Sequence, residues 1–302
     1  MAYRFKHGET VPENVKRIAR EQIGSAIAQL RGQGSVNGDE AIHEVRKSIK
    51  KTRALLRLVR PELGDFYAEE NVQLRDTARK LSALRDAGAL IGALDNLRKS
   101  GAAPASGPLA GPFARVRRVL TRQKHQLENE AGTNKLKPGL ATALLQARRT
   151  IQYWPLETDG FAAIEAGVEK TFRAGRKALA QARKSGRHED FHEWRKRVKD
   201  HWYQIRLLEK LWGDAMEGYE RSLKELEDAL GEDLTLAILD ERVRSMASAN
   251  GQGSKAAALI EAIGASRKEL REQALEVGDR VYAEKPREFT RRISRLWKAG
   301  QG

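Results

Sequence analysis

Two stretches of the chain share one pattern: residues 42–60 read IHEVRKSIKKTRALLRLVR, and residues 191–209 read FHEWRKRVKDHWYQIRLLE. The second stretch begins 149 residues after the first, and seven of the nineteen aligned positions are identical. The shared core is H-E-x-R-K-x-x-K, and an identical Arg-Leu pair follows it in each copy. Because this offset is about half of the 302 residues, the sequence predicts a duplicated architecture.

Each copy has the periodicity of an amphipathic helix. On a helical wheel one line of the first copy holds Val45, Ile49, Thr52, Leu56 and Val59, and the same line of the second holds Trp194, Val198, His201, Ile205 and Leu208. The cations gather about 130° away from that line. The pattern therefore predicts a packed stripe on one side of each helix and a row of positive charge on another.

The cation rows indicate an external anion. Like charges at helical spacings repel one another by a few tenths of a kcal/mol per pair, and the only acids inside the two motif cores are Glu44 and Glu193. Guanidinium and ammonium groups both bind phosphate oxygens, and histidine can donate a hydrogen bond or carry charge. We interpret the rows as an anion-binding surface, with a solvated helix face as the alternative.

The composition supports a polyanionic partner. The chain has 56 Lys and Arg against 41 Asp and Glu, a net charge of +15. Residues 1–150 carry +13 and residues 151–302 only +2. The segment 101–150 alone holds nine cations against two acids. This uneven distribution predicts a localised positive surface.

Several classes of protein are excluded or disfavoured. The chain has no cysteine, which excludes disulfides, thiolate metal sites and thiol catalysis. No apolar run approaches the ~18 residues of a membrane helix, and the start lacks the apolar segment of a signal peptide. We therefore expect no membrane association and a cytoplasmic location.

Helical periodicity dominates the chain, and alternating β-branched runs are lacking. Thr10, followed by Pro12 and Glu13, predicts one helix start, and Asp39 another whose helix Pro61 ends. Further helices are predicted over 64–84, 87–99, 112–130, 138–153, 159–184, 189–212, 214–229, 233–248, 254–282 and 286–298. Predicted breaks lie at 101–112, 154–155, 185–186 and 250–253. The pattern indicates an all-α bundle.

The duplicated H-x-x-R-K-x-x-K helix resembles the conserved histidine α-helical domain (CHAD) family, and the resemblance covers residues 8–300. It implies one compact all-α unit made of two four-helix bundles related by a pseudo-twofold axis, here 1–154 and 155–302, around a central basic channel. Members of the family bind inorganic polyphosphate in that channel and are associated with polyphosphate granules. The resemblance therefore implies non-catalytic polyphosphate binding at such granules.

Motif positions assign the channel lining that the resemblance implies. The first copy contributes His43, Arg46, Lys47, Lys50, Arg53 and Arg57, and the second contributes His192, Arg195, Lys196, Lys199 and Arg206. The helices preceding the two copies add Arg17, Arg20, Arg173, Arg176 and Lys177. The second copy departs from the first, because Trp202 matches Arg53 and Asp200 matches Lys51. We therefore predict that the first row binds phosphate more strongly than the second.

Two other function classes stay open. A sequence-nonspecific nucleic-acid-binding protein would suit the net charge, but single-strand binders usually add stacking aromatics, and the first row contains none. A polyphosphate-processing phosphohydrolase would need carboxylates for Mg²⁺, and the E-x-E-x-K signature of triphosphate-tunnel enzymes is absent. His43 and His192 are followed by cations that would repel a metal. We expect no catalytic residue, metal or cofactor, and the oligomeric state stays open.

Overall fold

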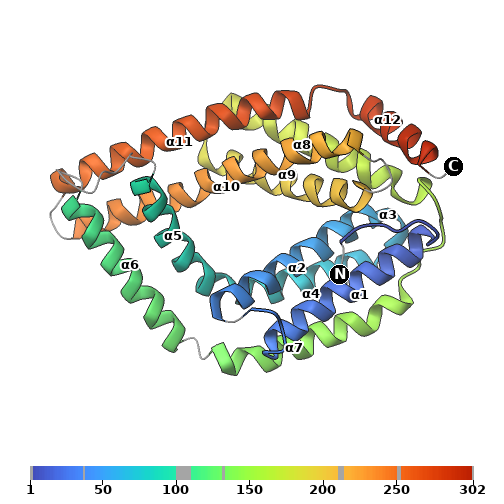
Figure 1. Ribbon diagram of the computed structural model, residues 1–302, viewed down its shortest axis with the longest axis horizontal. Coiled ribbons are helices and arrows are strands. Elements are labelled where there is room, and N and C mark those ends of the chain that lie inside the picture. Colours follow the sequence, from blue (N-terminus) through green and yellow to red (C-terminus); the bar gives the residue numbers. More distant parts are fainter. Residues whose placement is uncertain are drawn as a thin grey trace.

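The computed structural model describes residues 3–36, 38–99, 110–130, 133–209, 214–249 and 253–300, and in these ranges it is all-α, as predicted (Figure 1). The first half contains α1 (Val11–Leu30), α2 (Gly38–Leu58), α3 (Arg60–Leu63), α4 (Phe66–Lys80), α5 (Ser82–Lys99), α6 (Ala110–Glu130), α7 (Thr133–Thr150) and the short 3-10 helix η1 (Ile151–Tyr153). The second half contains α8 (Ala162–Ser185), α9 (His188–Leu208), α10 (Asp214–Ala249), α11 (Gly253–Val281) and α12 (Pro286–Ala299).

Local signals explain several helix ends. The Thr10 hydroxyl accepts from the Glu13 amide while the Glu13 carboxylate accepts from the Thr10 amide, which is the capping box that the sequence indicates. Pro61 follows the end of α2 and lies in the first turn of the short α3, which begins at Arg60. At the end of α8, Gly186 adopts a left-handed conformation with φ 62°. Helix boundaries are therefore fixed by turn chemistry at these three places.

Some predicted boundaries were wrong. The helices predicted over 214–229 and 233–248 are one helix, α10, because packing against α9 and α11 outweighs the cost of Gly231 in its interior. A side chain at Gly231 would approach Arg195 Nε to 3.2 Å, so glycine leaves space for that guanidinium. The break predicted between 84 and 87 lies instead at Leu81, and α7 begins before Pro138. Most of the predicted linker, 100–109, lies outside the described residues.

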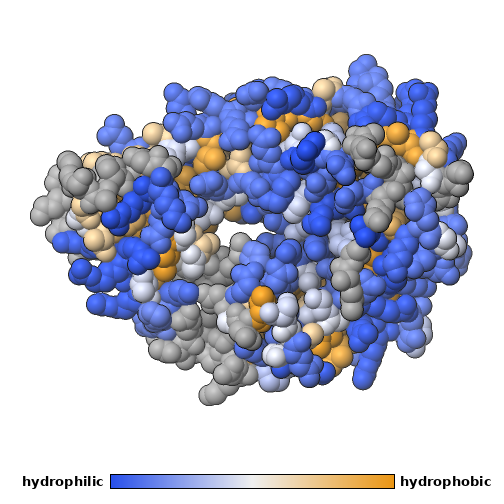
Figure 2. All heavy atoms as spheres, viewed as in Figure 1, coloured by the Kyte–Doolittle hydropathy of each residue, from blue (hydrophilic) through white to orange (hydrophobic). Residues whose placement is uncertain are grey.

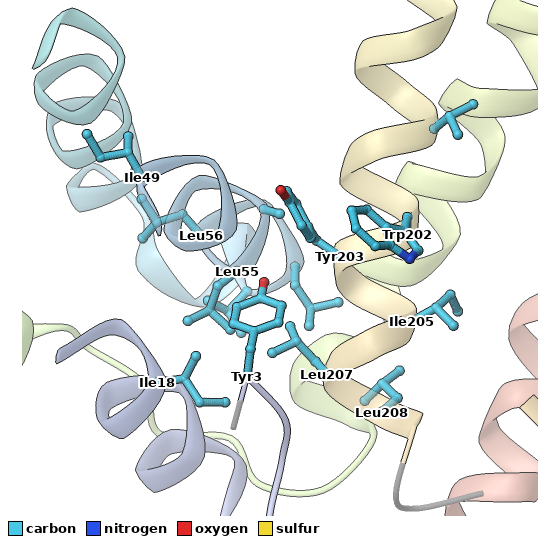
Figure 3. Close-up of a cluster of buried hydrophobic side chains, with 14 of the residues drawn as sticks. Tyr3, Ile18, Ile49, Leu55, Leu56, Trp202, Tyr203, Ile205, Leu207 and Leu208 are labelled. Atoms are coloured by element: carbon cyan, nitrogen blue, oxygen red, sulfur yellow. The ribbon is translucent and has the colours of Figure 1, made fainter. Parts of the chain in front are cut away.

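One large hydrophobic core joins the two halves of the chain. Helix α2 packs against α1 and α4 on one side and against α8 and α9 on the other. Figure 3 shows Leu55 and Leu56 of α2 near Leu207 of α9, with Tyr3 of the N-terminal segment between them. The Phe5 amide donates to the Leu207 carbonyl oxygen over 2.8 Å. The two motif helices therefore meet through their C-terminal halves within one compact unit.

A second, smaller core lies at the other end of the molecule. It joins α5 and α6 to the parts of α10 and α11 that are nearest the connection between them. Leu94, Leu120 and Leu259 are among its most buried members. This core holds the α5–α6 pair beside the α10–α11 pair. The division of the chain into bundles 1–154 and 155–302 stays a prediction.

Candidate anion-binding site

The packed stripe of each motif helix is confirmed. All ten residues predicted for the two stripes are buried. His201 lies in the second stripe among the rings of Phe172 and Tyr219, with Nδ1 3.3 Å from the Tyr282 hydroxyl. Burial lowers the pKa of His201 to about 3, with a smaller contribution from Arg292. His201 is therefore a neutral core residue, and the polar faces of α2 and α9 are left to carry the site.

In the first cation row, on α2, two arginines donate to neutral acceptors of α4. Arg46 Nη1 donates to the Ala78 carbonyl oxygen (3.0 Å), and Arg53 Nε donates to Asn71 Oδ1 (2.9 Å). Lys47 Nζ lies 2.9 Å from Glu44 Oε1 within the motif itself. His43 and Lys50 are partly exposed on the same helix. The contacts of Arg46 and Arg53 with these two acceptors hold both guanidinium groups against α4.

The second cation row, on α9, faces carboxylates of α10. Arg195 Nη2 and Lys199 Nζ both donate to Glu227 Oε1, over 2.9 and 2.7 Å. Burial alone would raise the pKa of Glu227, but the positive charges of Lys199 and Arg195 outweigh that effect. The pKa is therefore lowered overall, and the carboxylate is ionised. Lys196 Nζ lies 3.1 Å from Glu193 Oε2, as Lys47 lies beside Glu44. The second row therefore carries an internal counter-charge for two of its cations.

The two rows match contact by contact at the offset of 149 residues. Arg46 and Arg195 correspond, and their partners Ala78 and Glu227 have the same offset. The same offset relates Arg53 to Trp202 and Asn71 to Glu220, and Trp202 Nε1 donates to Glu220 Oε1 over 2.5 Å. Arg206 Nε lies 3.9 Å from that same Glu220. Neutral partners in the first half thus become acidic partners in the second.

The crossing of α2 and α9 is electrostatically unequal on its two sides. On one side Arg57 Nη1 donates to Asp200 Oδ1 over 2.9 Å, so these charges offset each other. The residues that correspond to this pair are Arg206 and Lys51, which are both cationic. Burial lowers the pKa of Lys51 to about 8, and Arg206 and Lys47 lower it too, while Glu44 opposes them. The ammonium of Lys51 stacks over the Tyr3 ring at 5.0 Å.

Burial and charge repulsion also act on two predicted site residues. Burial lowers the pKa of His192 to about 4, and Lys196 and Arg195 lower it further. Burial, followed by Arg57, lowers the pKa of Arg53 to about 10. Each shift shows a side chain held where positive charge is disfavoured in the absence of an anion. An anion beside these groups would favour their charged forms and so oppose the shifts.

The five cations predicted on the helices that precede the two motifs differ in their contacts. Arg17 is held by Glu9, with Nε and Oε2 2.7 Å apart, and by Asn14. Arg173 pairs with Glu169, and Arg176 donates to the Glu284 carbonyl oxygen. The remaining two, Arg20 and Lys177, are exposed. Arg17, Arg173 and Arg176 thus have partners outside the two rows, and the assignment of all five residues to the channel lining stays a prediction.

Helix contacts form a closed circuit beside the rows. Helix α2 contacts α5, α5 contacts α10, α10 contacts α9, and α9 contacts α2. Figure 2 shows an opening through the molecule in the region that these helices surround in Figure 1. A hollow of about 760 Å³ lies elsewhere, on α5 and α6. Whether the opening is the basic channel that the resemblance implies stays a prediction.

Sequence reasoning missed three residues that shape the site. Glu227 and Glu220 come from α10, which carries no motif, so only the packed structure shows that they face the second row. Lys51 lies just after the motif core and was not assigned to the site. Its match to Asp200 in the second copy was the signal that the two copies differ in charge at this position. Trp202, at 8% exposure, is packed and has the cations of Arg206 and Lys224 over its ring.

The described residues hold neither a metal-binding group nor a membrane-spanning helix. Within these ranges, no three His, Asp or Glu side chains gather as a metal-binding group would require. Among the helices of the described part, none combines the length and hydropathy of a bilayer-spanning segment.

Comparison with known proteins agrees with this architecture. A sequence model of the CHAD domain matches residues 21–244. The structure is similar to a crystal structure of the CHAD domain from the plant Ricinus communis, with a TM-score of 0.54, 14% identity, and coverage of 95% of this chain and 91% of that one. It is also similar to PptA from Streptomyces chartreusis, with a TM-score of 0.51, 16% identity, and coverage of 96% and 100%. No curated protein matches the chain.

Proposed function

The chain belongs to the CHAD domain family, and from this premise we propose that it binds inorganic polyphosphate along the cation rows of α2 and α9, without catalysing its turnover. The observation that carries the proposal is the duplicated row itself. Two helices with matching cations pack against each other through their C-terminal halves. Their N-terminal halves border the circuit α2–α5–α10–α9. A linear anion can therefore contact both rows at once.

The chemistry of the rows suits a chain of phosphates. Arginine forms two parallel hydrogen bonds to phosphate oxygens, and lysine adds a compact charge. Burial lowers the pKa values of Lys51 and His192, and neighbouring cations lower them further. A polyanion relieves this crowding and releases its counterions, so binding is expected to weaken steeply with salt.

Nucleic acid is the first competing ligand. Single-strand binders stack bases on exposed aromatic rings along a basic groove. The rings nearest the rows, Trp202, Tyr203 and Tyr3, are all buried, so they offer no stacking face. In the described part of the chain the rows thus offer charge for phosphate groups but no exposed ring nearby on which a base could stack. This favours the base-free polymer.

The proposal extends to location and organisation. Polyphosphate binding predicts that the protein associates with polyphosphate granules in the cytoplasm. The matched contacts at the offset of 149 residues support two halves, 1–154 and 155–302, each supplying one row.

A competition titration tests the proposal. Labelled long-chain polyphosphate is bound at about 150 mM salt and then displaced with unlabelled polyphosphate, single-stranded DNA or duplex DNA of equal phosphate content. We expect polyphosphate to displace the label at least tenfold better than either DNA. Equal displacement by DNA would contradict the proposal. Release of phosphate from polyphosphate in the presence of Mg²⁺ or Mn²⁺ would show the third alternative, a processing enzyme.

A further inference from the structure

A second row of cations lies on the α5–α6 pair, outside both motif copies. Its members line one hollow of about 760 Å³, together with Ala110, Ala114 and Thr121. The basic side chains of the lining are Arg98 from α5 and Arg117, Arg118, Arg122 and His125 from α6. On α6 their spacing follows one helix face over about two turns. We call this set the α6 row.

The α6 row points back toward the motif helices. Arg117 Nε and Nη2 lie 2.8 and 3.1 Å from the carboxylate of Asp95, and Arg98 lies 5.4 Å from the centre of the Phe113 ring. These two contacts show that α5 and α6 run antiparallel, so His125 lies toward the beginning of α5. That beginning follows Ala78, whose carbonyl oxygen accepts from Arg46 of the first motif.

Charge within the α6 row is only partly neutralised. Arg117 is paired with Asp95, whereas Arg118 and Arg122 are exposed, one helical turn apart, with no carboxylate partner in the described part of the chain. Two cations at this spacing repel each other. The motif rows do not account for this charge, which belongs to the strongly basic segment 101–150.

The ligand chemistry follows from the lining. Phe113 is 4% exposed and lies beneath Arg98, so the hollow offers guanidinium groups but no accessible Phe, Tyr or Trp ring for a base. We infer that the α6 row binds the distal segment of a polyphosphate chain whose other part lies on α2 and α9. The protein then prefers long chains to short ones. This inference rests on the proposed function, because the motif rows supply the first anchor.

The experiment compares two ligands and three proteins. Tripolyphosphate and long-chain polyphosphate are titrated into the original protein, into Arg118→Glu with Arg122→Glu, and into the control Arg291→Glu with Arg295→Glu. The control pair is exposed, has the same residue types and spacing, and lies on α12, which contacts α8 instead of α5 or α6. Both variants change the net charge equally, and circular dichroism confirms that each is folded.

We expect the α6 variant to bind long chains roughly tenfold more weakly and with a salt dependence shallower by about two contacts, because each lost phosphate contact lowers that slope by about one. Its affinity for tripolyphosphate should equal that of the control. Long-chain affinity equal to the control, or an equal loss for both ligands, would overturn the inference and leave the proposed function standing. If the original protein bound neither ligand, both would fail.

Discussion

Helices α2 and α9 carry the same motif, but the neighbouring helices offer different hydrogen-bond acceptors to its cations. Beside α2, Arg46 and Arg53 are oriented by a carbonyl oxygen and an amide. Beside α9, Arg195 and Lys199 share the buried carboxylate of Glu227. At the matched positions Arg46 and Arg195 the contacts therefore differ: a backbone carbonyl oxygen of α4 accepts in the first half, and a carboxylate of α10 accepts in the second.

The comparison teaches that a cationic motif does not by itself define an anion site. The charge available to a ligand is set by the helix that packs across the motif, α4 in the first half and α10 in the second. In the second half an external anion must compete with Glu227 for two cations. We therefore predict that the first row binds phosphate more strongly than the second.

The largest expected effect comes from removing one row at a time. Lys47→Ala with Lys50→Ala should weaken polyphosphate binding roughly a hundredfold, and the matched pair Lys196→Ala with Lys199→Ala only about tenfold, because Glu227 already offsets part of the second row. Titration at fixed salt measures both. Equal losses in the two variants would remove the difference between the rows.

Glu227→Gln sharpens the comparison by making the second half resemble the first. Releasing Arg195 and Lys199 should raise polyphosphate affinity up to about tenfold. The same change leaves two poorly solvated cations without their carboxylate, so we expect the unliganded protein to lose about 3 kcal/mol of stability. Thermal unfolding with and without polyphosphate measures both effects, and the ligand should restore much of the lost stability. Weaker binding in a folded variant would show that Glu227 supports the site instead of competing with it.

Lys51 tests whether the cationic side of the crossing between α2 and α9 takes part in binding. Its pKa is lowered to about 8, so the free amine loses its charge as pH rises through that value, whereas an anion would stabilise the charged form. Affinity should therefore fall about threefold between roughly pH 7 and pH 9. Lys51→Arg, which stays charged, should flatten this profile. A profile unchanged by that substitution would place Lys51 outside the binding surface.

The smallest effect concerns the packed stripes. Thr52 and His201 occupy matching buried positions, and only His201 titrates. Its pKa is lowered from 6.5 to about 3, so the unfolded chain takes up a proton first, and stability present above pH 6.5 is lost as pH falls. Between pH 7 and 6 the loss is about 0.5–1 kcal/mol. Unfolding of His201→Phe should lack this component, and the exposed-site control His7→Gln should keep it.

Periodicity predicted the stripes and the residues of both rows because helix faces are a local property of the sequence. Thr10, Pro61 and Gly186 likewise act within a few residues. The partners of the rows could not be predicted in this way. Glu227 and Glu220 meet α9 only when α10 packs across it, and Gly231 is explained only by Arg195 beside it. Tertiary packing thus decides how much charge the motif presents.

The most direct test of the central claim is a polyphosphate titration of the chain in which both rows are weakened together, with Lys47, Lys50, Lys196 and Lys199 all changed to Ala. Circular dichroism first establishes that the variant keeps its helical fold. At about 150 mM salt we predict no measurable binding, because four phosphate contacts are lost. Affinity within about threefold of the original protein would contradict the account.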